Sequence, residues 1–115
     1  MTSSLQVSTG TPILSLDTHI LIFALQGELM VEEEELLRRN DWCIASIVLW
    51  EIAKLSQLGR ISLSPTDPRL RSSLERITVW PLDLRIAEIS TRLDFKSDPA
   101  DEIIAATSVV HGIKL

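Results

Sequence analysis

The residues of this sequence best suited to chemistry are three acids, Asp17, Glu51 and Asp101. Clustered carboxylates without cysteine ligands or paired histidines are typical of sites for hard cations such as Mg²⁺ or Mn²⁺. Such a cation lowers the pKa of a bound water and stabilises the oxygens of a phosphate during an in-line displacement. Convergence of the three acids would therefore indicate metal-dependent hydrolysis of phosphodiester bonds.

Glu51 is the strongest single signal of the three. A helical wheel over 47–58 places it within an apolar stripe. The stripe consists of Val48, Ile52, Leu55 and Leu58. An ionised carboxylate in such a stripe is costly unless it is paired, hydrogen-bonded or bound to a metal. A salt bridge to Lys54 or Arg60, or a position at the edge of the stripe that reaches water, would explain Glu51 equally well.

Asp17 and Asp101 also have simpler explanations. Asp17 follows an apolar stretch at 13–16 and could bond to the backbone of its own turn. Asp98 and Asp101 could form the two hydrogen bonds of a capping box at the start of a helix over 99–111. Three acids that each lie at the top of a strand–helix unit nevertheless favour a shared site over three coincidences.

Alternating strand and helix patterns position these acids. Short apolar runs predict buried strands at 13–16, 42–45 and 77–80. Apolar periodicity with capping residues predicts helices at 20–25, 28–39, 47–58, 68–76, 84–93 and 99–111. This alternation predicts an α/β fold with a parallel sheet, in which functional residues gather at the carboxyl ends of the strands. A fourth strand is expected to begin at 113–115.

Length and composition limit the class of protein. The 115 residues fit one domain, here expected over 13–115 after a flexible leader at 1–12. Eleven basic and 16 acidic residues give a net charge of −5, which excludes nucleic-acid binding by charge alone. The single cysteine, Cys43, excludes an internal disulfide and indicates a reducing, cytoplasmic location. Neither a signal peptide nor a membrane span is expected.

Three segments together resemble the PIN domain family, and most closely the VapC-type toxin ribonucleases of bacterial toxin–antitoxin pairs. The segments are LDTHILIFAL from Leu16, IASIVLWEIAKLSQLGRISL from Ile44 and SDPADEIIAATSVVHGIKL from Ser97. The resemblance implies a three-layer α/β/α domain that, when complete, acts as a Mg²⁺- or Mn²⁺-dependent endoribonuclease on RNA. It also implies a small antitoxin that binds across the acidic site and the apolar helices near 20–58.

The family pattern assigns roles to positions of this chain. In that family an acid after the first strand, a Glu in the helix after the second and an Asp opening the last long helix bind the metal. These positions are occupied here by Asp17, Glu51 and Asp101. Asp98 matches a frequent neighbouring acid, and Thr18 and Ser46 match small hydroxyl positions beside the site that would orient a ligand or water.

The sequence departs from the family pattern in two places. Glu102 stands where the family commonly has Arg, which adds negative charge where an RNA backbone would approach. The family also continues past a segment like GIKL into a strand that ends in a fourth acid, and then into one more strand. A C-terminally incomplete domain is therefore expected, with the strand at 13–16 central in the complete fold. Its exposed apolar edge would favour self-association, for instance as a homodimer.

Two other kinds of protein remain as alternatives to the nuclease. A truncated, non-catalytic PIN remnant would only bind a partner. A phosphoacceptor receiver domain also places acids above a parallel sheet, but it needs an acid pair after the first strand and a Lys after a late strand. Asp17 is followed by Thr18, and the late Lys has no counterpart, so the pattern disfavours a receiver domain. A divalent-metal titration with an RNA cleavage assay would separate the nuclease from the remnant.

Overall fold

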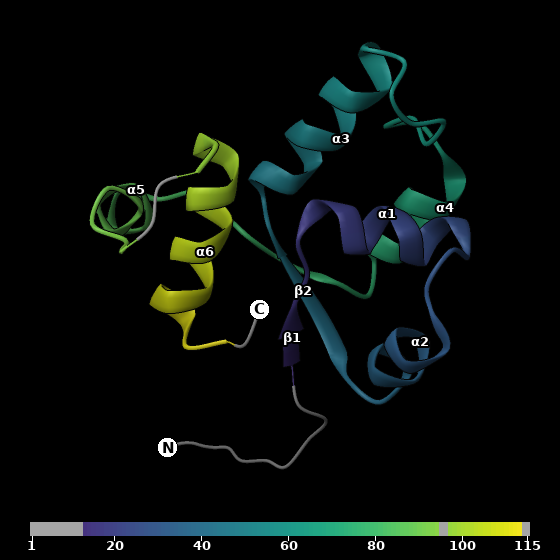
Figure 1. Ribbon diagram of the computed structural model, residues 1–115, viewed down its shortest axis with the longest axis horizontal. Helices are drawn as coiled ribbons and strands as arrows, with labels where there is room; N and C mark the ends of the chain where they lie inside the picture. Colours follow the sequence, from purple (N-terminus) through teal and green to yellow (C-terminus); the bar gives the residue numbers. More distant parts are fainter. Residues whose placement is uncertain (1–12, 95–96, 114–115) are drawn as a thin grey trace.

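A computed structural model describes residues 13–94 and 97–113, in which strands and helices alternate (Figure 1). The expected leader at 1–12 and the end of the expected fourth strand, 114–115, lie outside the described residues. In chain order the elements are β1 (Ile13–Ser15), α1 (Thr18–Gln26), α2 (Val31–Arg38), β2 (Asp41–Ala45), α3 (Ile47–Gln57), α4 (Pro68–Leu74), β3 (Thr78–Trp80), α5 (Leu84–Ser90) and α6 (Pro99–His111). Ile113, the described residue of the expected fourth strand, is not in a strand.

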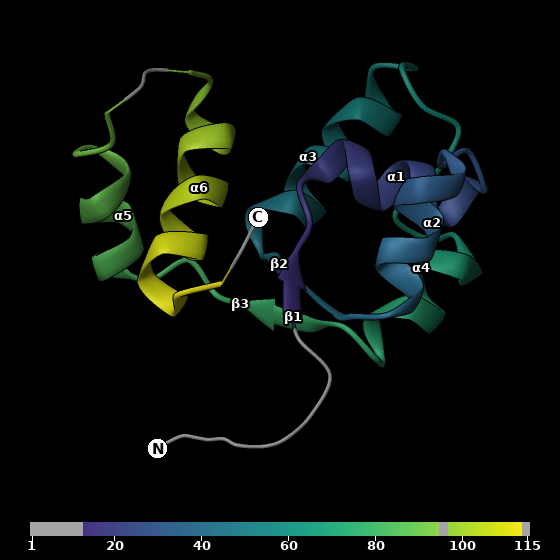
Figure 2. The same ribbon diagram turned by 60° about the horizontal axis from the view of Figure 1, so that its bottom comes forward.

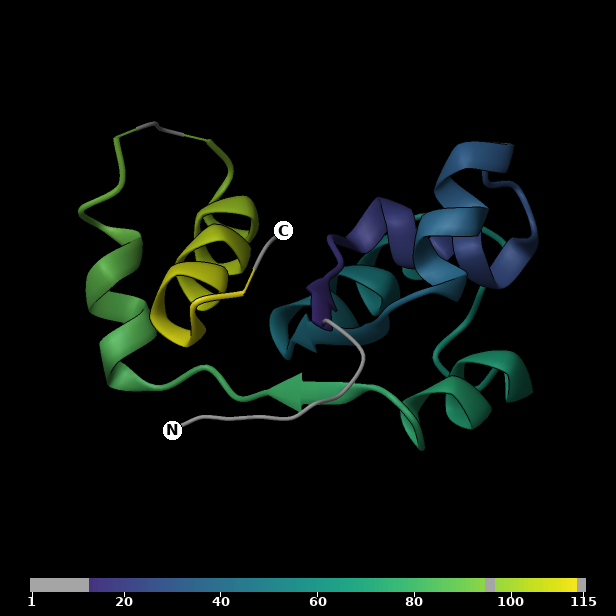
Figure 3. The same cartoon turned by 90° about the horizontal axis from the view of Figure 1, so that it is seen from below.

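The strands form a parallel sheet in the order β1-β2-β3, so within the described residues β2 is central. Ser15 of β1 pairs with Cys43 of β2, and Cys43 pairs in turn with Thr78 of β3. Helices α5 and α6 lie on one side of the strands, and α1, α2 and α4 lie on the other (Figure 3). The expected α/β fold with a parallel sheet between helices is therefore confirmed.

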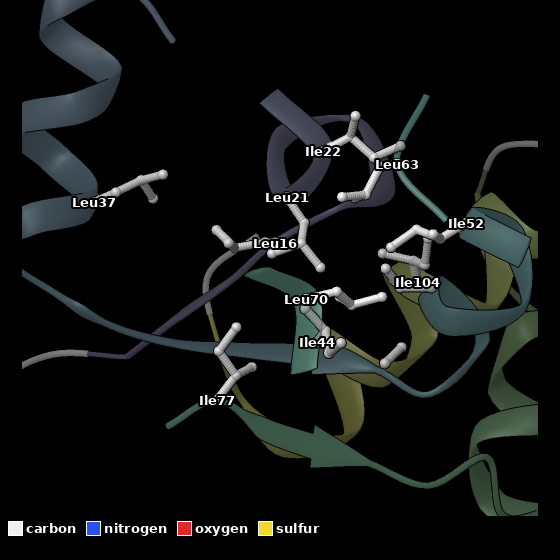
Figure 4. Packing of buried hydrophobic residues seen from close by; sticks show 12 residues of the cluster. Leu16, Leu21, Ile22, Leu37, Ile44, Ile52, Leu63, Leu70, Ile77 and Ile104 are labelled. Carbon is white, nitrogen blue, oxygen red and sulfur yellow. The ribbon is translucent and has the colours of Figure 1, made fainter. Parts of the chain in front are cut away.

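The hydrophobic core forms around β2 (Figure 4). Ile44 of β2 packs in one cluster with Leu16 and Leu21 from the start of the domain and with Ile104 of α6. Burial of each large apolar side chain contributes about 1.5–3 kcal/mol. Because Leu16 precedes Asp17 and Leu21 follows it within α1, the same core contacts hold Asp17 in place.

Helix ends form largely where local signals predict them. Gly27 and Gly112 adopt left-handed φ values of 72° and 62° and end α1 and α6. Asp83 begins α5, where its Oδ1 accepts a hydrogen bond from the backbone N of Ile86 at 2.9 Å. Each of these signals acts within one turn of its own helix.

The predicted buried stripe of α3 is shorter than the sequence indicates. Val48 and Ile52 are fully buried and Leu55 is half-buried, but Leu58 is 62% exposed. Leu58 is the C-cap of α3 and lies beyond its last helical residue, so the helical wheel does not apply to it. Among the described helices, none is long and apolar enough to cross a membrane.

Candidate active site

Asp17 lies between β1 and α1 and caps the helix. Its backbone is extended, and its Oδ1 accepts a hydrogen bond from the backbone N of Ile20 at 2.9 Å. The carboxylate therefore has the local turn role that the sequence allowed. Within the described residues, its second oxygen, Oδ2, has no hydrogen-bond partner.

Glu51 is joined to the residue that follows Asp17. The hydroxyl of Thr18, the first residue of α1, donates a hydrogen bond to Glu51 Oε1 on α3, 33 residues away in sequence. Thr18 is only 3% exposed and Glu51 is half-buried, and α1 packs against α3. The structure thus brings Glu51 into contact with the residue next to Asp17, beyond the carboxyl ends of β1 and β2.

The salt-bridge explanation of Glu51 is not supported. Lys54 donates instead to Gln57 Oε1 at 3.0 Å, and in the described part of the chain neither Lys54 nor Arg60 pairs with Glu51. The ion pairs of the described residues involve other acids, namely Glu34, Glu35, Asp67 and Glu88. In the described part of the chain, neither Glu51 nor Asp17 thus has a cationic partner.

Asp101 occupies the first turn of α6 and is exposed. Its Oδ2 accepts a hydrogen bond from the Ser97 hydroxyl at 3.0 Å, and Glu102 Oε2 accepts one from the Ser97 backbone N at 3.2 Å. Asp98 is the N-cap but its side chain makes no capping bond. The proposed capping box of Asp98 and Asp101 is therefore wrong. Ser97 bonds to both Asp101 and Glu102 instead.

Helix α6 lies on the opposite face of the sheet from α1, but it begins at the same end of the sheet as α1 and α3, toward which the strands run (Figures 1 and 2). Helix α3 packs against both α1 and α6. Asp17, Glu51 and Asp101 thus belong to elements that begin at this end of the sheet. In residues 13–94 and 97–113, however, no three Asp, Glu, His or Cys side chains are close enough to hold one metal ion. The structure joins Glu51 to Thr18, the neighbour of Asp17, whereas the described hydrogen bond of Asp101 is to Ser97.

Two protein carboxylates are nonetheless enough to hold some divalent cations. Mg²⁺ keeps several of its waters and is commonly held by one or two carboxylates together with substrate phosphates. Asp17 and Glu51 each use one oxygen in a hydrogen bond within the protein and leave the other without a described partner. This all-oxygen donor set fits Mg²⁺ or Mn²⁺.

Ser46 connects the end of β2 with the segment that follows β3. It is the N-cap of α3, but its side chain makes no capping bond. Its Oγ accepts a hydrogen bond from the backbone N of Leu82 at 3.1 Å, and its own N donates to Trp80 O at 2.8 Å. Ser46 therefore ties the connection between β3 and α5 to the end of β2.

The sequence reasoning missed two roles near the acids. Thr18 was expected to orient a ligand or water, and its bond to Glu51 has no local sequence signal. Ser97 was not considered, although its position shortly before the acids of the α6 first turn resembles a capping pattern. That pattern could have predicted its bonds to Asp101 and Glu102.

Comparison with known proteins assigns the family. The PIN domain family model matches residues 14–115, so the chain belongs to the PIN domain family. The resemblance seen in the sequence is therefore confirmed. No curated protein matches the chain significantly.

Solved structures share the fold. A chain of a toxin–antitoxin complex from Klebsiella pneumoniae is 24% identical with a TM-score of 0.65, and the match covers 87% of this chain and 81% of that one. A chain of the crystal structure of VapBC2 from Rickettsia felis bound to a DNA fragment from their promoter is 18% identical with a TM-score of 0.65. That match covers 88% of this chain and 83% of the other. At these low sequence identities, the two matches establish that the folds are alike and nothing more.

Proposed function

We propose that this protein is a metal-dependent endoribonuclease and the toxin of a bacterial toxin–antitoxin pair that acts in the cytoplasm. The observation that carries the proposal is the hydrogen bond from Thr18 to Glu51. It holds Glu51 against the residue that follows Asp17, near the strand ends where α/β proteins place their functional groups. Membership of the PIN domain family supports a nuclease.

Asp17 and Glu51 would hold Mg²⁺ or Mn²⁺, and Asp101 would approach as a third acid from the start of α6. The cation would activate water and stabilise negative charge on the phosphate. Asp17 is kept rigid by its bond to the backbone N of Ile20, and Glu51 by its bond to Thr18. Asp98 is exposed at the start of α6 and would lie at the rim of the site.

The negative net charge of the chain supports a site that binds its substrate through a bound cation. The net charge of −5, with acids at the strand ends, would repel an RNA backbone. A divalent cation between Asp17 and Glu51 would neutralise their two negative charges and offer a positive centre to a phosphate, so RNA binding should itself require metal.

An antitoxin is the proposed protein partner. Both structural neighbours come from toxin–antitoxin assemblies. Large apolar side chains are exposed on the helices where binding is expected, among them Phe23, Met30, Val31, Leu36 and Trp50. A basic side chain of the partner inserted beside Asp17 and Glu51 would neutralise their charge and exclude the metal. A homodimer is a further proposed assembly, through the apolar edge of β1.

Cleavage of a labelled single-stranded RNA by the 115-residue chain, with Mg²⁺, Mn²⁺ or EDTA, tests the enzymatic proposal. Cleavage should need the metal and should be lost in Asp17→Asn and Glu51→Gln. Asp67→Asn is a matched control, because Asp67 caps α4 in an ion pair with Arg69 outside this site. Equal cleavage by wild type and Asp17→Asn would show that the acids are not the site.

A non-catalytic, partner-binding protein is the second candidate. It is favoured by one observation, that Asp101 does not join Asp17 and Glu51 in a three-acid group within the described residues. Under this alternative, the chain binds neither Mn²⁺ nor RNA but still forms a stable complex with a small protein encoded beside it. Metal-dependent RNA cleavage would exclude it.

A further inference from the structure

The hydroxyl of Thr18 donates a hydrogen bond to a side chain that is distant in sequence. Threonine in a helix often donates to the backbone carbonyl one turn earlier. Thr107 does this, with its Oγ1 at 2.8 Å from Ile103 O. Thr18 is the first residue of α1 and has no preceding helical turn, and its single proton goes to Glu51 Oε1.

This bond restricts a flexible carboxylate. A glutamate side chain has several rotatable bonds, and fixing it costs conformational entropy unless a partner already holds it. Thr18 is almost fully buried and its β-branched side chain has few rotamers, so its hydroxyl is a rigid anchor. Asp17, the preceding residue, accepts a hydrogen bond from the backbone N of Ile20 in the same first turn of α1. The two neighbouring residues Asp17 and Thr18 thus set the positions of both acids.

We propose that Thr18 is a positioning residue that holds Glu51 ready for a divalent cation and does not itself touch the cation. The inference rests on the proposed function, because it assumes that Asp17 and Glu51 bind the metal. Thr18 bonds to Oε1 alone, so among the described residues Glu51 Oε2 has no partner, and the bond holds Glu51 against the residue next to Asp17. Loss of the hydroxyl leaves the charges in place but lets Glu51 adopt other rotamers, so metal affinity should fall.

The experiment is a Mn²⁺ titration of the full 115-residue chain, read by electron paramagnetic resonance of free Mn²⁺. Thr18→Val keeps the shape of the side chain and removes the donor, and Thr18→Ser keeps the donor. Removing a group that orients a metal ligand typically weakens metal binding by about 10- to 100-fold. We expect a loss in that range for Thr18→Val and near wild-type affinity for Thr18→Ser.

Thr107→Val is the matched control. Thr107 is also buried and hydrogen-bonded, but to its own helix, so its replacement removes a comparable hydroxyl without contact to Glu51. A purely structural role of Thr18 would lower the melting temperature of the metal-free protein and leave the Mn²⁺ affinity as in Thr107→Val. If Thr18→Val does not fold, Thr18→Ala serves in its place with the same expected loss of affinity.

The outcomes separate this inference from the proposed function. Wild-type affinity in Thr18→Val, together with loss of binding in Glu51→Gln, would overturn the role of Thr18 and leave the metal site standing. Failure of Thr18→Ser to restore binding would also overturn it. Absence of Mn²⁺ binding by the wild type, or equal binding by Asp17→Asn and wild type, would overturn the proposed function itself.

Discussion

Trp80 and His111 stack with their ring centroids 3.9 Å apart and their planes 17° from parallel. Trp80 ends β3 and His111 lies in the last turn of α6. The stack therefore ties the C-terminal end of α6 to the sheet, while Asp101 lies at the opposite end of the same helix. The position of Asp101 relative to the strand ends depends in part on this contact.

Replacement of His111 by Ala should loosen α6. An aromatic stack of this kind contributes about 0.5–1.5 kcal/mol beyond burial of its area, so the free energy of unfolding should fall by about 1 kcal/mol. Urea denaturation followed by circular dichroism measures the change. Val109→Ala, at an exposed position of the same helix, is the control and should have little effect. An unchanged free energy of unfolding in His111→Ala would show that the stack does not hold α6.

Asp17→Asn should keep the fold and abolish metal binding. Asparagine is as good an N-cap as aspartate, so the bond from the backbone N of Ile20 can form. Removing one of two neighbouring negative charges also relieves repulsion with Glu51 in the metal-free protein. We expect a metal-free melting temperature equal to or above that of wild type, measured by differential scanning fluorimetry. A clearly lower value would mean that the charge of Asp17 is needed for folding rather than for a ligand.

Divalent metal should stabilise the wild type by linkage. A ligand that binds only the native state adds about 2.7 kcal/mol at 100 times its dissociation constant. Mg²⁺ or Mn²⁺ should therefore raise the melting temperature of the wild type, and EDTA should reverse the rise. Glu51→Gln should show little of this shift. A rise of equal size in Glu51→Gln would place the metal elsewhere.

Asp101→Asn should separate binding from catalysis. Asp101 is exposed and bonds to Ser97, outside the Asp17–Glu51 pair. We expect the variant to fold and to bind Mn²⁺ measurably through the other two acids, but to lose RNA cleavage. Ser97→Ala removes the competing hydrogen bond and should retain cleavage. Full cleavage by Asp101→Asn would remove Asp101 from the site.

The Asp67–Arg69 pair should give a pH-dependent contribution to stability. The side-chain hydrogen bond from Arg69, with the bond from its backbone N, lowers the pKa of Asp67 from its usual 3.8. Because the folded-state pKa is the lower one, this contribution is present above the unfolded value and is lost as pH falls through the folded value. Asp67→Asn should therefore lower the melting temperature at neutral pH, and the difference should shrink in strong acid. A difference independent of pH would contradict an ionic origin.

Local signals in the sequence determined the elements of this fold. Gly27 and Gly112 end helices, and Asp67 and Asp83 begin them, because each acts on backbone groups within one turn. Alternation of these helices with short apolar runs was enough to predict a parallel α/β sheet. The parallel direction of β1 and β2 places the residues that follow them, Asp17 and the start of α3 with Glu51, toward the same end of that sheet, as the sequence indicated.

The contacts of those side chains follow from the packing of whole elements and have no signal in the sequence. The bond between Thr18 and Glu51 joins residues 33 positions apart, and it forms because α1 and α3 pack on one core that includes Leu21 and Ile52. Ser46 bonds to Leu82 for the same kind of reason, since β2 and β3 end side by side. Local propensity acts over one helical turn, whereas a hydrogen bond between distant side chains depends on how whole elements pack.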